Sequence, residues 1–200
     1  ETVERFARLK PAAPDFRIYW DNAYSIHHLY DENQDFLVEI LEECTKAGNP
    51  DIVYKFTSTS KVSFPGSGIA AVAASKANLE DFRSYMQIQT IGHDKLNQLR
   101  HVKFFKDLDG LHAHMRKHAA IIRPKFELVL DTLEKELGGL GIGEWTKPHG
   151  GYFISFESME GCAKAIVAKA KEAGVVLTGA GATYPYGKDP KDSNIRIAPS

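Results

Sequence analysis

The stretch from Asp51 to Ala71, "DIVYKFTSTSKVSFPGSGIAA", joins an apolar segment to a run of hydroxyl side chains, one lysine and a Pro-Gly-Ser-Gly turn. Its first six residues, Asp51–Phe56, are rich in β-branched and aromatic side chains, which is typical of a strand. The residues from Gly68 to Ser75 predict a second, buried strand, because both of its faces are apolar. The loop between the two strands carries Lys61 and is therefore the first candidate for a functional site.

The residues before this stretch predict a βαβ unit. Phe16–Trp20, "FRIYW", has the composition of a strand. A stripe of apolar side chains at helical spacing follows and closes at Gly48–Pro50; it comprises Phe36, Leu37, Ile40, Leu41 and Cys44. Strand, helix and strand in this order predict parallel strands, so we expect an α/β fold with a mostly parallel sheet covered by helices.

A short helix is expected after the second apolar run, with Asn78 as its N-cap. The second half of the chain then predicts one long helix, because apolar residues from Met115 to Leu137 recur at steps of three and four. Pro124 lies inside this pattern and is expected to kink or divide the helix, since it lacks an N–H and crowds the preceding turn. A small α+β unit follows, with strands expected at "GGYFISFE", "VVL" and "IRIA" and a helix face made by Cys162, Ile166, Val167 and Ala170.

The composition is that of an ordinary globular protein, with 43% hydrophobic and 26% charged residues. A formal net charge of -1 with mixed signs gives no reason to expect a nucleic acid or an acidic membrane as partner. Cys44 and Cys162 show no disulfide or metal-binding pattern, which favours a reducing, cytoplasmic setting. No apolar run approaches the length of a membrane span.

Polar clusters follow two of the expected strands. Asp21-Asn22-Ala23-Tyr24 comes after "FRIYW", and Ser58-Thr59-Ser60-Lys61 comes after "DIVYKF". In open α/β sheets, ligands bind outside the carboxyl ends of the strands. If the two strands are neighbours, the two clusters converge on one crevice.

This set of side chains suits pyridoxal phosphate, which needs an amine for its aldehyde and a carboxylate for its ring nitrogen. Lys61 would be the amine and Asp21 the carboxylate, while Tyr24 would donate to the phenolic oxygen and Ser58 or Ser60 would bind the phosphate. Each residue alone has an ordinary explanation as an exposed lysine, a turn aspartate or a rim tyrosine. Their joint occurrence at successive strand ends favours the cofactor.

The same segments resemble a known family. "DNAY" resembles the Asp-x-Ala-Tyr motif of fold-type I, class I aminotransferases, and "STSKVSFPG" resembles their lysine segment. "NIRIAPS" is similar to the C-terminal segment whose arginine, here Arg196, binds the substrate α-carboxylate. "TSTSKVSFPGSGIA" and "QTIGHDKLNQLRHVKFF" resemble the aspartate-aminotransferase subgroup that is related to the catalytic domains of MocR-type regulators.

The resemblance implies a homodimeric enzyme that moves an amino group from an L-amino acid, aspartate or glutamate, to a 2-oxo acid. It also implies that residues 1–120 are part of the cofactor-binding large domain plus the start of the connecting helix, and that residues 121–200 form the small C-terminal α+β domain. The chain starts without methionine and ends inside "NIRIAPS", so we expect a piece of a longer protein that lacks the first part of the cofactor site.

The sequence differs from the family at the position of the arginine that binds the cofactor phosphate. Many relatives have an arginine seven or eight residues after the lysine, where this chain has Gly68 and Ile69. Phosphate binding is then expected to rest on Ser58, Ser60, backbone N–H groups or a residue outside this chain. The fragment alone is expected to bind the cofactor poorly or not at all.

Several interpretations stay open at this stage. The distal carboxylate of a dicarboxylic substrate needs a second cation, for which the candidates are His93, Lys95 and Arg100. The competing explanation for each of these residues is a solvated residue at the start of a helix. Three further histidines have no carboxylate or cysteine to complete a metal site, and they fit the exposed face of the long helix: His112, His114 and His118. Tyr184 and Tyr186 border either the substrate or a packed loop. Alternative functions are a lyase or decarboxylase on the same fold, a ligand-sensing domain of a regulator, and a degenerate scaffold.

Overall fold

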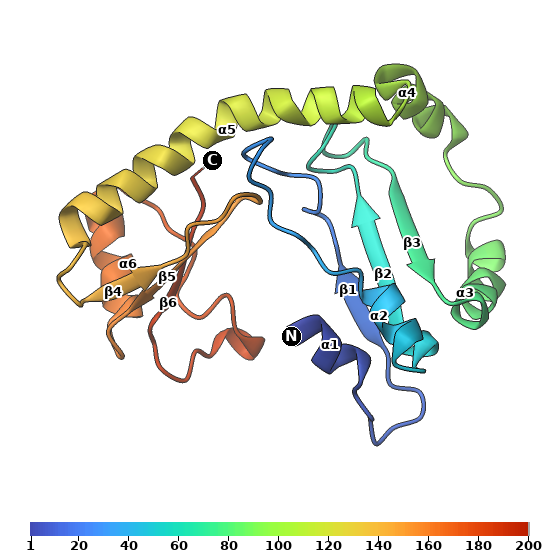
Figure 1. The fold of residues 1–200 in the computed structure, drawn as a ribbon, viewed down its shortest axis with the longest axis horizontal. Helices are drawn as coiled ribbons and strands as arrows, with labels where there is room; N and C mark the ends of the chain where they lie inside the picture. The colour runs from blue at the N-terminus through green and yellow to red at the C-terminus, as the bar shows by residue number, and fades with distance from the viewer. Residues whose placement is uncertain (200) are drawn as a thin grey trace. The chain divides into compact units, whose positions relative to one another are not determined.

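The computed structural model describes residues 1–199, and Ser200 at the end of "NIRIAPS" lies outside that description. The chain divides into two compact units (Figure 1). The first contains Glu1–Ser25 and Phe36–His114, and the second contains Ile26–Asp35 and Met115–Ser200. A short segment of the first half of the sequence thus belongs to the second unit.

The first unit contains a three-stranded sheet in the order β1-β2-β3 with helices beside it (Figure 1). Its elements are α1 (Thr2–Ala7), β1 (Ile18–Asp21), α2 (Ile40–Lys46), η1 (Pro50–Ile52), β2 (Val53–Ser58), β3 (Ala70–Ala74), α3 (Lys76–Gln89) and α4 (Lys95–Phe105). Ile40, Cys44 and Val53 are fully buried in its core. The predicted α/β class is confirmed.

The predicted βαβ unit is present, because β1 and β2 are parallel and α2 lies between them in the chain. The third strand differs from the expectation. β3 runs antiparallel to β2, and Ser58 pairs with Ala70 where the loop begins. β3 is an edge strand with mostly exposed residues, so the prediction that it is buried is wrong for the described part of the chain. An apolar run shows strand propensity but encodes neither its direction nor what covers it.

The helix after β1 starts later than its apolar stripe suggests. Phe36 and Leu37 precede α2 and are exposed. Glu39 is the N-cap, and its carboxylate accepts a hydrogen bond from the N–H of Leu41 at 3.0 Å. The same carboxylate forms an ion pair with Lys55 of β2. The cap therefore fixes where the helix begins and ties it to the sheet.

The N-cap of α3 is Ser75, whose hydroxyl accepts from the N–H of Asn78 at 3.2 Å. The prediction that Asn78 is the cap is wrong. Its buried side chain donates to the carbonyls of Asp51 at 2.8 Å and Val53 at 3.4 Å. Ser and Asn are both capping residues, and here the tertiary contact with β2 decides which of them takes that role.

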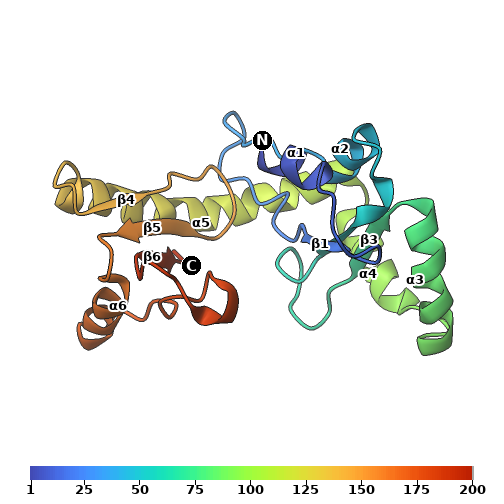
Figure 2. The ribbon, with the colours of Figure 1, turned by 90° about the horizontal axis from the view of Figure 1, so that it is seen from below.

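The second unit contains an antiparallel sheet in the order β4-β5-β6, with α6 and the part of α5 from Met115 onward as its helices (Figure 2). Its elements are α5 (Leu108–Leu137, which begins in the first unit), β4 (Gly143–Trp145), β5 (Ile154–Ser158), α6 (Ala163–Glu172), η2 (Pro185–Gly187) and β6 (Asn194–Ile197). The expected strand at "VVL" is absent, since residues 175–177 have no regular structure.

Helix α5 continues through Pro124, so of the two expected effects, a kink or a division, the division does not occur. Phe126, two residues after Pro124, is fully buried against Leu29 and Ile154. Packing of this kind offsets the backbone hydrogen bond that proline cannot donate.

Residues 26–35 join the second unit by pairing with the loop before β5. The N–H of Leu29 donates to His149 O, and the N–H of Gly151 donates to His27 O, both at 2.8 Å. His28 forms an isolated antiparallel bridge with Gly150. Among residues 1–199, no helix has the length and apolar character required to cross a membrane.

Candidate active site

Asp21 is the last residue of β1, and its Cα is in register with that of Phe56 in β2. The N–H of Asn22 donates to Phe56 O at 2.8 Å, which extends the pairing one residue beyond the strand. The N–H of Ala23 donates to Asp21 Oδ1 at 3.1 Å. This Asx-type turn fixes the carboxylate at the carboxyl end of the sheet. Tyr24 lies in the same turn and is half-buried.

Ser58 ends β2 at the same edge of the sheet, because β1 and β2 are parallel. Thr57 Oγ1 donates to Asn22 O at 3.4 Å, which joins the two strand ends. The N–H of Ser60 donates to Ser58 Oγ at 3.4 Å, and the exposed Lys61 follows. The structure thus brings five of the six predicted site residues to consecutive strand ends in one unit.

Lys61 lies on a closed turn. Thr59 O accepts from the N–H groups of Val62 at 2.9 Å and Ser63 at 2.8 Å. The backbone N–H of Thr59 donates to Ile69 O at 2.8 Å, and its hydroxyl accepts from the N–H of Ile69 at 2.9 Å. The segment on either side of Lys61 is therefore held by hydrogen bonds to its own loop.

Side chains from α4 and α5 hold this loop from outside, and sequence reasoning missed them. His101 Nε2 lies 2.7 Å from Ser63 Oγ and 3.1 Å from Thr59 Oγ1. Asn97 Nδ2 donates to Gly68 O at 3.0 Å. His114 Nε2 lies 2.8 Å from Val62 O, so the expectation that His114 belongs to an exposed helix face is wrong. A single buried histidine carries no pattern that marks it in a sequence.

Gly68 occupies one of the two positions where many relatives have the phosphate-binding arginine. A Cβ at Gly68 would lie 3.1 Å from the backbone N of Ser60 and 3.2 Å from its hydroxyl. Both distances are tighter than ordinary van der Waals contact. The absence of a side chain at this position therefore lets the turn before β3 lie against the residue next to Lys61.

Arg196 lies on β6 in the second unit and is half-buried. Its guanidinium carbon is 4.5 Å from the centroid of the Phe153 ring, and its Nε donates to Thr178 Oγ1 at 3.4 Å. These contacts fix the plane of the guanidinium group, whose geometry suits a carboxylate.

The candidates for a second cation lie at and near the start of α4, where His93, Lys95 and Arg100 are all exposed. Asp94 is the N-cap and accepts from the N–H of Asn97 at 2.9 Å. Arg100 also lines an open groove of about 500 Å³ beside Ser63. In the second unit, Tyr186 is 95% exposed.

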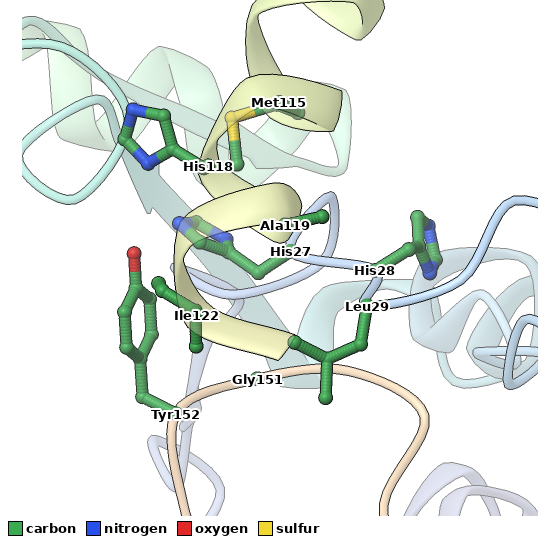
Figure 3. A pocket seen from close by; sticks show the side chains of 9 residues that line it. All are labelled: His27, His28, Leu29, Met115, His118, Ala119, Ile122, Gly151 and Tyr152. Carbon is green, nitrogen blue, oxygen red and sulfur yellow. The ribbon is translucent and has the colours of Figure 1, made fainter. Parts of the chain in front are cut away.

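A small cavity of about 10 Å³ lies within the second unit (Figure 3), and its volume suits at most one water molecule. The rings of His27, His118 and Tyr152 gather on one side of it, while His28 points away. The centroids of His27 and Tyr152 are 5.1 Å apart. Within residues 1–199, no three histidine, cysteine or carboxylate side chains are arranged to hold a metal ion.

The family model described as "Aspartate amino-transferase" matches residues 1–200, the whole of this chain. The chain belongs to the aspartate aminotransferase family. An aspartate aminotransferase of Corynebacterium glutamicum is 44% identical over 200 residues, which are all of this chain and 46% of that protein. A protein of Mycolicibacterium smegmatis is 46% identical over the same length and with the same coverage.

Solved structures of aminotransferases have the same fold. The crystal structure of an aspartate transaminase from Corynebacterium glutamicum matches 99% of this chain and 46% of its own, with a TM-score of 0.92 and 44% identity. The α-aminoadipate aminotransferase LysN of Thermus thermophilus shares the fold, with a TM-score of 0.70 at 22% identity over 92% of this chain and 45% of its own. The chain spans about half the length of these relatives. The resemblance to aspartate-type aminotransferases that was inferred from its motifs is confirmed.

Proposed function

We propose that the full-length protein is a pyridoxal-phosphate-dependent aminotransferase that moves the amino group of L-aspartate or L-glutamate to a 2-oxo acid. The observation that carries this proposal is the parallel register of β1 and β2, in which Asp21 pairs with Phe56. This register places a carboxylate on the strand next to the one that leads to Lys61. Membership of the aspartate aminotransferase family supports the class of reaction.

The side chains present fit the cofactor. Lys61 offers a primary amine, Asp21 a carboxylate fixed by the N–H of Ala23, and Ser58 and Ser60 two hydroxyls beside the backbone N–H groups of the loop. Tyr24 offers a phenol from the turn after β1. Pyridoxal phosphate, when bound, supplies an electron sink that stabilises negative charge at the substrate Cα.

Each of these residues has a role in the proposed reaction. Lys61 Nζ would take the proton from the Cα of the amino-acid donor as general base. In the half-reaction with the 2-oxo acid it would give a proton to the Cα of the product amino acid as general acid. Asp21 would accept a charge-assisted hydrogen bond from the protonated ring nitrogen of the cofactor and would keep that nitrogen protonated. Arg196 binds the substrate α-carboxylate through its planar fork, which Phe153 and Thr178 orient.

The test is an assay of the full-length protein with pyridoxal phosphate, L-aspartate and 2-oxoglutarate, in which oxaloacetate formation is measured. We expect Lys61→Ala to lower the rate by roughly 10²- to 10⁴-fold, because the general acid–base group is lost. Lys76→Ala, at the exposed start of α3, is the matched control and should leave the rate unchanged. Near-normal turnover in Lys61→Ala would disprove the assignment. Release of carbon dioxide or ammonia in place of an oxo acid would indicate a decarboxylase or a lyase.

The resemblance also supports three proposals about the whole protein. These are a homodimer, a cytoplasmic location, and a division in which residues 1–120 are part of the cofactor-binding large domain plus the start of the connecting helix and residues 121–200 are the small domain. Residues 26–35 and 115–120 belong to the second compact unit and are the exceptions to this division. Sedimentation of the full-length protein tests the first, and a mass equal to one chain would exclude it.

A further inference from the structure

We infer that His101 is a positioning residue for Lys61. The inference rests on the proposed function only for its effect on catalysis, because the contacts themselves need no cofactor. Thr59 and Ser63 flank Lys61 at two residues on either side, and His101 Nε2 lies within hydrogen-bond distance of both hydroxyls, at 3.1 and 2.7 Å. One ring thus holds both ends of the turn that carries the amine.

The hydrogen-bond partners determine the tautomer of this ring. His101 Nδ1 is 2.8 Å from Asn97 O, and a carbonyl only accepts, so Nδ1 carries the proton and donates. In the neutral ring Nε2 is then an acceptor. Its single lone pair accepts from the nearer hydroxyl, that of Ser63 at 2.7 Å. Thr59 Oγ1 lies at 3.1 Å, and its O–H also has Ile69 O as an acceptor at 3.4 Å. The ring therefore acts toward the loop as a hydrogen-bond acceptor.

The burial of His101 requires that both of its ring nitrogens have hydrogen-bond partners. His101 is 7% exposed, and a buried polar ring lowers stability unless its nitrogens are paired. Both nitrogens of His101 have partners, one within α4 and one in the Lys61 loop. The Phe105 ring packs on it with a centroid distance of 6.0 Å. The contact with the loop therefore gives Nε2 of His101 a partner that α4 does not supply.

A second contact from the same helix supports the inference. Asn97 and His101 are four residues apart and share one face of α4. While His101 contacts Ser63, the amide of Asn97 donates to Gly68 O at 3.0 Å, near the end of the loop. A single helix thus fixes the loop at two separated points, and Lys61 lies just before the first of them.

Loss of the His101 contact should change the position of Lys61 more than the binding of the substrate. Lys61 has to reach the reacting atoms within hydrogen-bond distance, and a misplacement of about 1 Å can lower a rate by about 10²-fold. Loss of the His101 contact should therefore lower kcat and leave the KM for aspartate nearly unchanged, because Arg196 is in the other unit.

The experiment compares full-length His101→Ala, His101→Gln and the control His112→Ala, which changes an exposed histidine of α5. The first readout is hydrogen exchange at the amides of Val62, Ser63 and Ile69 in cofactor-free protein. We expect exchange about fivefold faster in His101→Ala, because one hydrogen bond is worth about 1 kcal/mol. The control should match the wild type. His101→Gln should recover most of the protection, because Gln Oε1 can accept where Nε2 does.

The second readout is kcat against KM for the same variants. We expect kcat to fall by roughly 10- to 100-fold in His101→Ala and to recover in His101→Gln. Unchanged exchange and unchanged kcat in a folded His101→Ala would overturn the inference, and so would a folded Gln variant that behaves like the Ala variant.

Two further outcomes remain decisive. If His101→Ala does not fold, Ser63→Ala takes its place. We expect faster exchange in Ser63→Ala than in His101→Gln, and the reverse order would overturn the inference. If the wild type shows no aminotransferase activity, the proposed function fails, while the exchange data still decide whether His101 holds the loop.

Discussion

Asp35 accepts two hydrogen bonds from His149, one from its backbone N–H at 3.2 Å and one from Nδ1 at 3.0 Å. Asn33 Nδ2 lies 3.0 Å from the other ring nitrogen of His149, so the ring is bonded on both sides. Asp35 and Asn33 belong to the segment that joins the second unit from the first half of the chain. The Asp35–His149 pair is therefore one of the links that hold residues 26–35 in place.

The pH dependence of stability follows from this pair. The side-chain hydrogen bond from His149, aided by the backbone N–H, lowers the pKa of Asp35 from its ordinary value. A lowered folded-state pKa stabilises the protein above the unfolded pKa, and that contribution is lost as the pH falls through the folded value. We expect urea midpoints of the full-length protein to fall below about pH 4. Asp35→Asn should weaken this dependence, whereas Asp31→Asn, an exposed neighbour, should not change it.

Gly68→Ala tests the close approach beside Lys61. The new methyl group would lie 3.1 Å from the backbone N of Ser60, so the loop has to shift by a few tenths of an ångström. We expect turnover to fall by about tenfold with little change in the free energy of unfolding. Gly92→Ala is the control, since a Cβ there meets nothing within 4 Å. Equal kinetics for both variants would show that the loop tolerates the methyl group.

Arg196→Lys tests the α-carboxylate site. Lysine keeps the charge but loses the planar fork and the stacking on Phe153. Because a hydrogen bond to a charged group contributes about 1.5–3 kcal/mol, we expect the KM for aspartate to rise roughly 10- to 100-fold. Arg116→Lys, on the exposed side of α5, should leave the KM unchanged. An unaltered KM in Arg196→Lys would remove Arg196 from the proposed site.

Phe126→Ala tests the core of the second unit. The Phe126 side chain has no exposed surface and packs against Leu29 and Ile154. Its removal should lower the free energy of unfolding by about 3–5 kcal/mol, because it leaves a cavity. Leu128 lies on the same helix but is 68% exposed, so Leu128→Ala should change stability by less than about 0.5 kcal/mol. Urea unfolding of the full-length variants measures both.

Local patterns predicted much of this fold. The parallel strands β1 and β2, the long helix α5 and the strands β5 and β6 were expected because alternation and helical spacing are short-range signals. Three features were not predicted, because each depends on contacts between residues distant in sequence: the direction of β3, the cap of α3 and the continuity of α5 through Pro124.

The candidate site likewise contains residues that the sequence predicted and residues that it did not. Asp21, Ser58 and Lys61 carry recognisable side chains at predicted strand ends, and the parallel register brings those ends together. His101 lies forty positions after Lys61 on a helix whose relation to the loop is purely tertiary. A lone histidine within "LRHVKFF" gives no spacing from which its partners can be deduced.

The position of Leu29 has a consequence for how the chain acquires its structure during translation. Leu29 completes the core formed by Phe126 and Ile154, yet it leaves the ribosome about a hundred residues earlier than Phe126. At about 5–20 residues per second, its apolar side chain waits roughly 5–20 seconds for Phe126 and longer for Ile154. Residues 26–35 are thus made well before the rest of their unit, and a factor that shields nascent apolar segments would have time to bind Leu29.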